Sequence, residues 1–279
     1  MPALSLRVAA ALLIAAAIPV KGFAKEPFAV TFDPPYTARA MVTGTRPETR
    51  PAGFADALHD VLVKVSGDPR LIGDPRVKPF EHDAGKLVAR YSYHDQLEGI
   101  PIHDEQGTRD RAFDLICDFK PAAIDAILKR LGDAPWKGAR PRLAIFVGVK
   151  TARGPFVLAS DGERGIDQRI SLATAANKRG IEAVVPSTQV LTERKIDYHM
   201  LDSPKPIRLD FAAKAAGGEL PLWGTLEWKD DPAGWKTNWR FGWQGREYRW
   251  HGAGISFDEA FREGFMGVAQ IASGHGAPN

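Results

Sequence analysis

Four histidines in the chain are each followed directly by an aspartate, a pairing that supplies metal ligands in one class of metal-dependent hydrolases. Such an enzyme needs several ligands that converge on one ion from a helical scaffold. Adjacent residues on a strand point to opposite faces, so a single dipeptide there cannot present both groups to the same ion. At least two of the pairs fall in expected loops or strands, and we interpret most of them as solvated surface pairs. The four pairs are His59-Asp60, His82-Asp83, His94-Asp95 and His103-Asp104.

One of these pairs keeps a catalytic hypothesis open. His59 and Asp60 lie on one short arc of an expected helix, and Asp56 stands nearby on the same helix. Imidazole and carboxylate groups are suitable ligands for zinc or manganese. Asp56, His59 and Asp60 are therefore the residues to inspect for a metal-dependent hydrolase. The sequence contains no recognisable catalytic set, cofactor motif or metal-binding motif beyond them, so we predict no cofactor.

Three further patterns are interpreted as structural. Ser66-Gly67-Asp68 follows a helix and lacks the strand-to-helix elbow that exposes a nucleophilic serine. The glycine-containing loop 154–165 has the wrong spacing for a phosphate-binding loop, and Asp161 and Glu163 would repel a phosphate. Cys117 is the single cysteine, which rules out an intramolecular disulfide, and its place in an apolar alternation predicts a small core residue.

Tryptophans gather near the end of the chain, where six of the seven lie in residues 223–250. Their parity on expected strands predicts that most of them cover helices in a core. Trp223 points to the opposite face and is therefore either under a second layer or exposed. An exposed Trp223 beside Thr225 and Glu227 is the candidate contact site for a partner. The stripe expected in the core comprises Trp228, Trp235, Trp239 and Trp243.

The elements that would position these residues form two small domains of the α+β and α/β classes. The first spans 25–133 in the order β-α-α-β-β-α and is organised around a helix at 54–66. Apolar residues repeat on one face of that helix, and Gly67 stands where a left-handed cap would end it. Residues 134–141 contain two prolines and a glycine, which interrupt both periodicities and predict a linker.

The second domain spans 142–273 and is followed by a tail, 274–279. Its expected order is β-α-β-α-β-β-β-α around a mixed sheet. Strand 143–149 is apolar on both faces, and a right-handed crossover would place strand 181–185 parallel to it. Gln244-Gly245 predicts a tight hairpin between the last two strands, and Ser256 with Glu259 predicts a capping box for the final helix.

Residues 1–24 have the pattern of a secretory signal peptide. A basic residue, Arg7, precedes an apolar run that is too short to span a membrane comfortably, and small residues near Ala24 suit a signal peptidase. Lys25 rather than a cysteine would follow the cut, so a lipid anchor is not indicated. We therefore predict a periplasmic protein with no integral membrane span after cleavage.

The charge balance argues against a nucleic-acid partner. The chain carries 37 basic and 34 acidic residues, and removal of the leader with Arg7 and Lys21 leaves a net charge of about +1. No basic run or dense basic patch appears, so the electrostatic pattern of a nucleic-acid binder is missing.

Three segments together resemble a family of exported Gram-negative envelope proteins of unknown function, DUF2066. They are LVKVSGDPRLIGDP, FDLICDFKPAAIDAILKRLG and RPRLAIFVGV. Residues 96–110 look like an insertion, and Lys120 replaces the acidic residue usual before the proline-led helix. The resemblance implies no activity, cofactor or catalytic residue. More loosely, the second domain is similar in its order of elements to the amino-terminal domain of TolB and to curli-secretion modules, and such a likeness concerns architecture alone.

Two functional hypotheses follow. The favoured one is a non-catalytic periplasmic protein that binds an envelope partner, either a protein or peptidoglycan, through the sheet edge or aromatic face of the second domain. The alternative is a metal-dependent hydrolase that uses His-Asp pairs. The sequence leaves the identity of the partner and the oligomeric state open.

Overall fold

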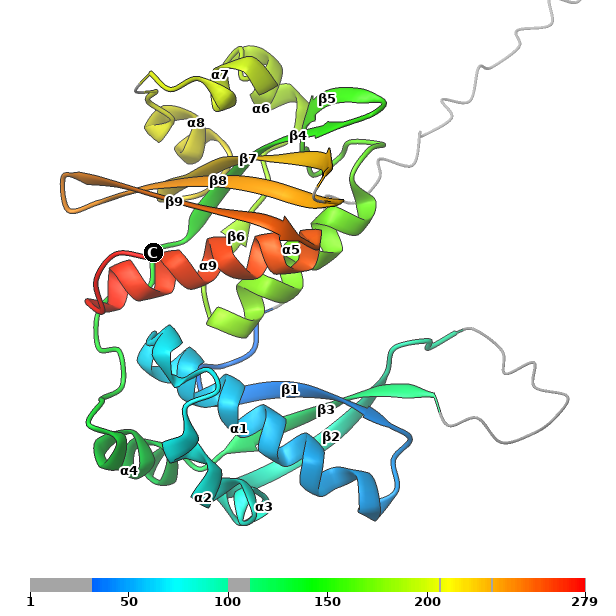
Figure 1. The fold of residues 1–279 in the computed structure, drawn as a ribbon, viewed down its shortest axis with the longest axis vertical. Coiled ribbons are helices and arrows are strands. Elements are labelled where there is room, and N and C mark those ends of the chain that lie inside the picture. Colours follow the sequence, from blue (N-terminus) through cyan, green and yellow to red (C-terminus); the bar gives the residue numbers. More distant parts are fainter. Residues whose placement is uncertain (1–31, 100–110, 206, 232, 279) are drawn as a thin grey trace, which may run out of the picture.

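The architecture is that of a computed structural model, which describes residues 32–99, 111–205, 207–231 and 233–278 (Figure 1). The described chain is an α+β fold of two domains, each with its own sheet. The predicted leader, 1–24, and the pair His103-Asp104 lie outside the described residues. Among the helices of the described ranges, none has the length and apolar character needed to cross a membrane.

The first domain is a three-stranded antiparallel sheet, in the order β1-β3-β2, packed against one long helix, α1. The predicted order β-α-α-β-β-α is confirmed in outline, with short helical turns between α1 and β2. Its elements are β1 (Thr37–Thr43), η1 (Pro47–Thr49), α1 (Arg50–Ser66), η2 (Pro69–Leu71), η3 (Pro75–Val77), α2 (Lys78–Glu81), α3 (Ala84–Leu87), β2 (Val88–Asp95), β3 (Ala112–Phe119) and α4 (Pro121–Leu131).

Helix α1 begins one turn earlier than the sequence predicts and ends where it predicts. A proline in the first turn suits the helix start, and Gly67 closes the helix with φ of 77°, a left-handed conformation that glycine adopts without strain. The apolar face, with Leu58, Val61 and Leu62, is fully buried in the domain core. Cys117 is also buried there, and burial raises the pKa of its thiol to about 12, so it is a core residue rather than a nucleophile.

The second domain has a mixed sheet in the order β5-β4-β7-β8-β9, in which β4 pairs in parallel with both β6 and β7. The expected order is confirmed in its main elements, and the structure adds a short strand, β5, and two short helices. The elements are β4 (Leu143–Thr151), β5 (Gly154–Val157), α5 (Ile166–Arg179), β6 (Ala183–Val184), α6 (Thr188–Glu193), α7 (Tyr198–Asp202), α8 (Asp210–Ala215), β7 (Leu220–Asp230), β8 (Ala233–Trp243), β9 (Arg246–Ile255) and α9 (Phe257–Ser273).

Helices cover both faces of this sheet. Helices α5 and α9 lie on one face, and α6, α7 and α8 lie on the other (Figure 1). Trp235 and Trp239 are buried under α5 and α9, as predicted. Trp228 is 43 % exposed and donates a hydrogen bond to Asp230, so its placement in the core was wrong. It sits near the end of β7, beyond the area that the helices cover, and meets Trp235 edge to face.

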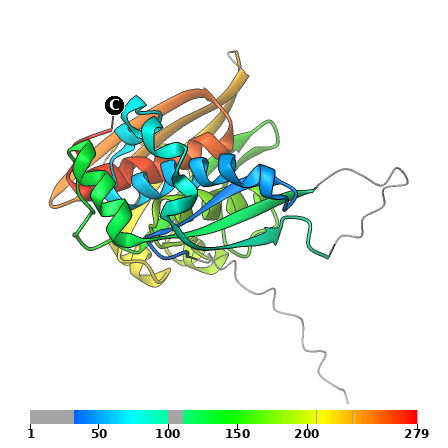
Figure 2. The same ribbon diagram turned by 90° about the horizontal axis from the view of Figure 1, so that it is seen from below.

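The two domains meet where α1 ends. Helix α1 lies between the first sheet and helix α5, and Figure 2 shows it overlapping α9 when the molecule is seen from below. The segment 134–141 closes the junction: the backbone N–H of Trp136 donates to the carbonyl of Val65 at 2.8 Å, and Arg140 Nη2 donates to the carbonyl of Lys64 at 2.6 Å. These carbonyls belong to the last turn of α1, which has no intrahelical donors for them. The predicted linker is therefore also the cap of this helix.

The two left-handed caps, Gly67 and Gly132, give a matched pair for testing the junction. A Cβ atom on Gly67 would lie 2.6 Å from the Cβ atom of Ser273, whereas a Cβ atom on Gly132 would meet nothing within 4 Å. We expect Gly132→Ala to lower the free energy of unfolding by about 1–2 kcal/mol through backbone strain alone. Gly67→Ala adds overpacking and should cost about 2 kcal/mol more. Chemical denaturation measures both, and equal losses would contradict the packing of α9 against the end of α1.

A buried lysine in α1 should make stability depend on pH. Lys64 is 2 % exposed, its Nζ donates to the carbonyl of Thr37, and burial lowers its pKa to about 8. The unfolded chain, with a lysine pKa near 10.4, then binds more protons than the folded chain between these two values, so stability rises with pH in that window. Between pH 7.5 and pH 10 the gain should be about 2 kcal/mol.

The variant Lys64→Met serves as the control for that measurement. It should lack this rise, because the group that titrates is gone, while the remaining groups titrate as before. Denaturant unfolding of both proteins across this pH range gives the difference. Parallel pH profiles would contradict the assignment of the effect to Lys64.

Candidate functional site

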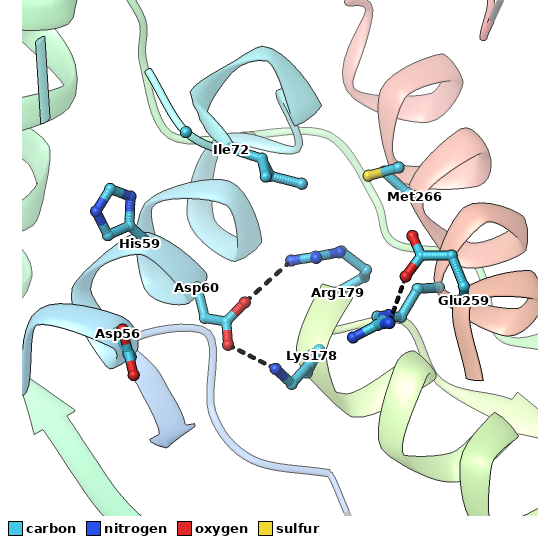
Figure 3. A pocket seen from close by; sticks show the side chains of 10 residues that line it. Asp56, His59, Asp60, Ile72, Lys178, Arg179, Glu259 and Met266 are labelled. Carbon is cyan, nitrogen blue, oxygen red and sulfur yellow. Dashed lines mark hydrogen bonds and ion pairs between the residues drawn. The ribbon is translucent and has the colours of Figure 1, made fainter. Parts of the chain in front are cut away.

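A pocket of about 490 Å³ opens between the two domains (Figure 3). This size suits a small ligand or the end of a peptide. Helix α1 and the loop after it supply one wall, and the end of α5 and the first half of α9 supply the other. The residues that line it are Asp56, His59, Asp60, Ile72, Gly73, Lys178, Arg179, Glu259, Arg262 and Met266.

Asp60 joins the two walls. Its carboxylate accepts a hydrogen bond from Lys178 Nζ at 2.9 Å and lies 3.7 Å from Arg179 Nη1 (Figure 3). The cations come from the last turn of α5, where positive charge also complements the helix dipole. This ion pair therefore connects the domains and fixes the position of both cations.

Arg179 is the most unusual group of the pocket. Its side chain is only 5 % exposed, and neither Nε nor Nη1 has a hydrogen-bond partner. Burial is the main reason that the pKa of this guanidinium is lowered, and the Asp60 carboxylate opposes that shift. Buried polar groups in proteins are nearly always hydrogen-bonded, because an unmet donor loses its water without compensation. Arg179 thus has donors left over for another acceptor.

A second guanidinium faces the same space from α9. Arg262 is 43 % exposed and forms an ion pair with Glu259, one turn earlier on the helix. Its Nε atom is buried and also lacks a hydrogen-bond partner. Two guanidinium groups with spare donors, on neighbouring helices, form an arrangement that suits a carboxylate or phosphate oxygen.

The three residues singled out from the sequence all line this pocket, but they do not form a metal site. His59 Nε2 lies 2.8 Å from the carboxylate of Glu81, and its ring points away from Asp60 (Figure 3). Asp60 is directed at the two cations, which would repel a metal ion. Asp56 is exposed, and within the described chain it makes no hydrogen bond or ion pair.

The other described His-Asp pairs stay apart from the pocket. His82 and Asp83 are exposed, and their side chains pair with each other at 3.3 Å. On β2, His94 lies near Glu98 and Asp114, whereas Asp95 accepts from Arg111. They are solvated or surface ion pairs, as the sequence analysis predicts.

The predicted contact site at Trp223 is corrected by the structure. Trp223 is 4 % exposed and packs in the core under α7 and α8, so an exposed aromatic contact there was wrong. Thr225 is 2 % exposed and lines a small cavity of about 260 Å³ beneath the loop after α7. The Glu227 carboxylate forms ion pairs with Lys150 Nζ and Lys229 Nζ, each at 2.9 Å. Three short helices between β6 and β7, of which the sequence predicts only the last, form the second layer that covers this face.

Sequence reasoning missed the cationic half of the pocket. In the sequence, Lys178 and Arg179 look like the ordinary basic residues of a last helical turn. Arg262 and Glu259 look like an ion pair along one helix. No linear spacing connects these residues to α1. Only the packing of α5 and α9 against α1 brings them beside Asp60.

Comparison with known proteins gives one match. The model of a family described as a domain of unknown function, DUF8605, matches residues 29–137. That stretch contains the first domain and ends within the linker, so it includes Asp60 but not Arg179. No curated protein and no solved structure matches the chain. The resemblance to DUF2066 stays a prediction.

The interdomain ion pair gives a stability prediction. Asp60→Asn leaves the buried Arg179 without its nearest counter-charge, and we expect a loss of about 2–3 kcal/mol in the free energy of unfolding. Asp83→Asn is the control, since that carboxylate pairs with Lys86 and His82 on the surface, and it should leave stability unchanged. Urea unfolding compares the two variants, and indistinguishable midpoints would show that Asp60 does not compensate Arg179.

Proposed function

We propose that the protein is a non-catalytic periplasmic binding protein whose interdomain pocket receives a peptide end that carries both a carboxylate and an ammonium group. The observation that carries this proposal is the buried Arg179, whose Nε and Nη1 have no hydrogen-bond partner. A carboxylate offers two oxygens in the geometry that a guanidinium donates to, and it would satisfy these groups.

The charges around the pocket support a ligand with two opposite charges rather than a simple anion. Arg179 stands toward α9, the helix that carries Arg262. Asp56, which has no counter-ion among the described residues, stands at the other end of the pocket, on α1 (Figure 3). Ile72 is 51 % exposed at the rim, and Met266 lines the wall, so apolar surface is available for the body of the ligand. Envelope sources of this chemistry are peptidoglycan stem peptides and chain ends of envelope proteins.

Binding is favoured over catalysis because, apart from the exposed Asp56, the histidine and carboxylates that line the pocket are already paired. His59 pairs with Glu81, Asp60 with Lys178, and Glu259 with Arg262. A general base or a nucleophile needs a free lone pair directed at the substrate. A ligand carboxylate reaches the shielded donors of Arg179 once the side chains around them shift slightly, and it then completes their hydrogen bonds.

The alternative, a metal-dependent hydrolase, rests on the presence of Asp56, His59 and Asp60 along one wall. Lys178 and Arg179 lie against Asp60, and their charge opposes a cation there. Zinc or manganese bound at this wall would be lost in a His59→Ala/Asp60→Ala variant. Metal analysis of that variant and of the wild-type protein would then favour the hydrolase.

Calorimetric titration with defined peptides tests the proposal. The probes are the stem tripeptide L-Ala-γ-D-Glu-meso-diaminopimelate, the L-peptide Ala-Ala-Lys and the carboxyl-terminal amide of each. We expect at least one free acid to bind, and its amide to bind at least about tenfold more weakly, because a charge-assisted hydrogen bond to the guanidinium is lost. The two free acids distinguish a peptidoglycan source from a protein source.

A matched pair of arginine variants tests whether the peptide binds in the interdomain pocket. Arg262→Gln should weaken the productive peptide about tenfold, whereas Arg249→Gln should not. Both arginines are ion-paired and about half exposed, but Arg249 pairs with Glu247 on β9, outside the pocket. Failure of both free acids to bind at millimolar concentration would overturn the proposal, as would equal effects of the two substitutions.

A further inference from the structure

Three ionisable side chains from distant parts of the sequence meet beyond the end of α1, at the domain junction. Asp68 follows α1, Asp133 follows α4, and His275 follows α9. One potential ligand atom from each lies within 4.8 Å of the other two, and within the described ranges this is the only such group of three or more. No charge pattern in the sequence connects these residues.

The group is compact and largely shielded from solvent. His275 Nε2 lies 3.2 Å from Asp133 Oδ1 and 4.0 Å from Asp68 Oδ2. The side chains of Asp68, Asp133 and His275 are 5 %, 13 % and 16 % exposed, respectively. Separations of this order are close to those between the ligands of one tetrahedral metal ion, so small side-chain shifts are sufficient to close the site.

An oxygen in the group lacks a partner. Asp133 Oδ2 is buried and accepts no hydrogen bond. Burying a carboxylate oxygen without compensation is costly, so a positive charge or a donor is expected beside it. Arg70 does not fill this role, because it is hydrogen-bonded to both oxygens of Asp68. Its side chain is 71 % exposed, so it has to turn into solvent for Asp68 to bind an ion.

The hydrogen bonds of His275 indicate where its lone pair points. Its Nδ1 lies 2.7 Å from Ser273 Oγ, and that hydroxyl also lies 3.3 Å from the carbonyls of Gly67 and Gln270. Carbonyls only accept, so when the hydroxyl donates its one hydrogen to either of them, it accepts from Nδ1–H of His275. In the neutral imidazole, Nε2 then carries a lone pair that faces Asp133 Oδ1. Two lone pairs at 3.2 Å repel unless a cation lies between them.

We propose that Asp68, Asp133 and His275 bind one divalent transition-metal ion, of the class of Zn²⁺, with water as the fourth ligand. One imidazole and two carboxylates suit zinc, and three protein ligands with an open position are typical of its partly accessible sites. The bond from Nδ1 to Ser273 is the outer interaction that usually orients a metal-binding histidine. The ion would join the ends of α1, α4 and α9.

A serine-protease-like role for the same residues is disfavoured. Ser273, His275 and Asp133 form a chain of contacts, but Ser273 is the last residue of α9, where the negative end of the helix dipole opposes a developing oxyanion. Its Oγ also packs against Gly67, where an added Cβ atom would come within 2.7 Å. The hydroxyl is therefore placed to orient His275 rather than to attack a substrate.

The test is metal titration of the full chain after removal of metal with a chelator. We expect one Zn²⁺ per chain, and we expect His275→Gln to abolish stoichiometric binding. His94→Gln is the matched control, because His94 also lies beside two carboxylates, those of Glu98 and Asp114, but on the surface. Ser273→Ala should weaken zinc binding about tenfold by removing the outer hydrogen bond.

Several results would overturn the site. Absence of zinc binding at micromolar concentration would overturn the site and leave a protonated His275 as the cation between the carboxylates. Zinc binding that persists in His275→Gln would overturn it too, because the ion would then lie elsewhere. Binding of Ca²⁺ in preference to Zn²⁺ and Mn²⁺ would overturn the choice of metal class. Circular dichroism confirms that each variant is folded, and Asp133→Asn repeats the test if His275→Gln is not. Peptide binding in the interdomain pocket is measured separately, so either proposal can fail alone.

Discussion

The arrangement of the two domains depends on how the last turn of α1 is capped. A helix ends with carbonyls that have no partner within it, and a buried helix end needs donors from elsewhere. Here the donors come from the segment between the domains: Trp136 binds the carbonyl of Val65, and Arg140 binds that of Lys64. Arg140 also donates to the carbonyl of Arg179 at the end of α5. One short segment therefore completes α1 and holds α5 beside it, and the pocket lies where these helices meet.

Charge buried at this junction is the second organising feature. Lys64, Arg140 and Arg179 are all withdrawn from water, and burial lowers the pKa of Arg140 to about 10. Replacing buried ion pairs by apolar residues often leaves stability unchanged or improves it, so such groups are weak evidence for stabilisation. The presence of these charged groups is better explained by the hydrogen-bond acceptors that they hold in place or that a ligand would supply. Arg140 holds carbonyls of both domains, whereas Arg179 keeps donors free at the wall of a pocket.

Sequence patterns predicted the helices and strands more reliably than they predicted which side chains are exposed to solvent. Periodicity located α1 and the strands with their inward faces, and Gly67 marked the helix end, because these signals are local. Parity also placed Trp223 on the face opposite the main core, but it cannot say whether another layer covers that face. Short helices of five or six residues do so, and two of them, α6 and α7, have too weak a periodicity to be predicted. The same limit explains Trp228, which has the right parity but lies beyond the covering helices.

The sequence by itself determined the two-domain α+β class, the mixed sheet of the second domain and the inward side of strands such as 113–119 and 235–243. It also pointed to Asp56, His59 and Asp60, which do line the pocket. Only the tertiary structure decided what surrounds them. The partners of Asp60 come from a helix more than a hundred residues away, and hydrogen-bond donors without partners become visible only when burial is known. Chemistry at the junction was hidden from the sequence because packing between domains, not spacing along the chain, brings its groups together.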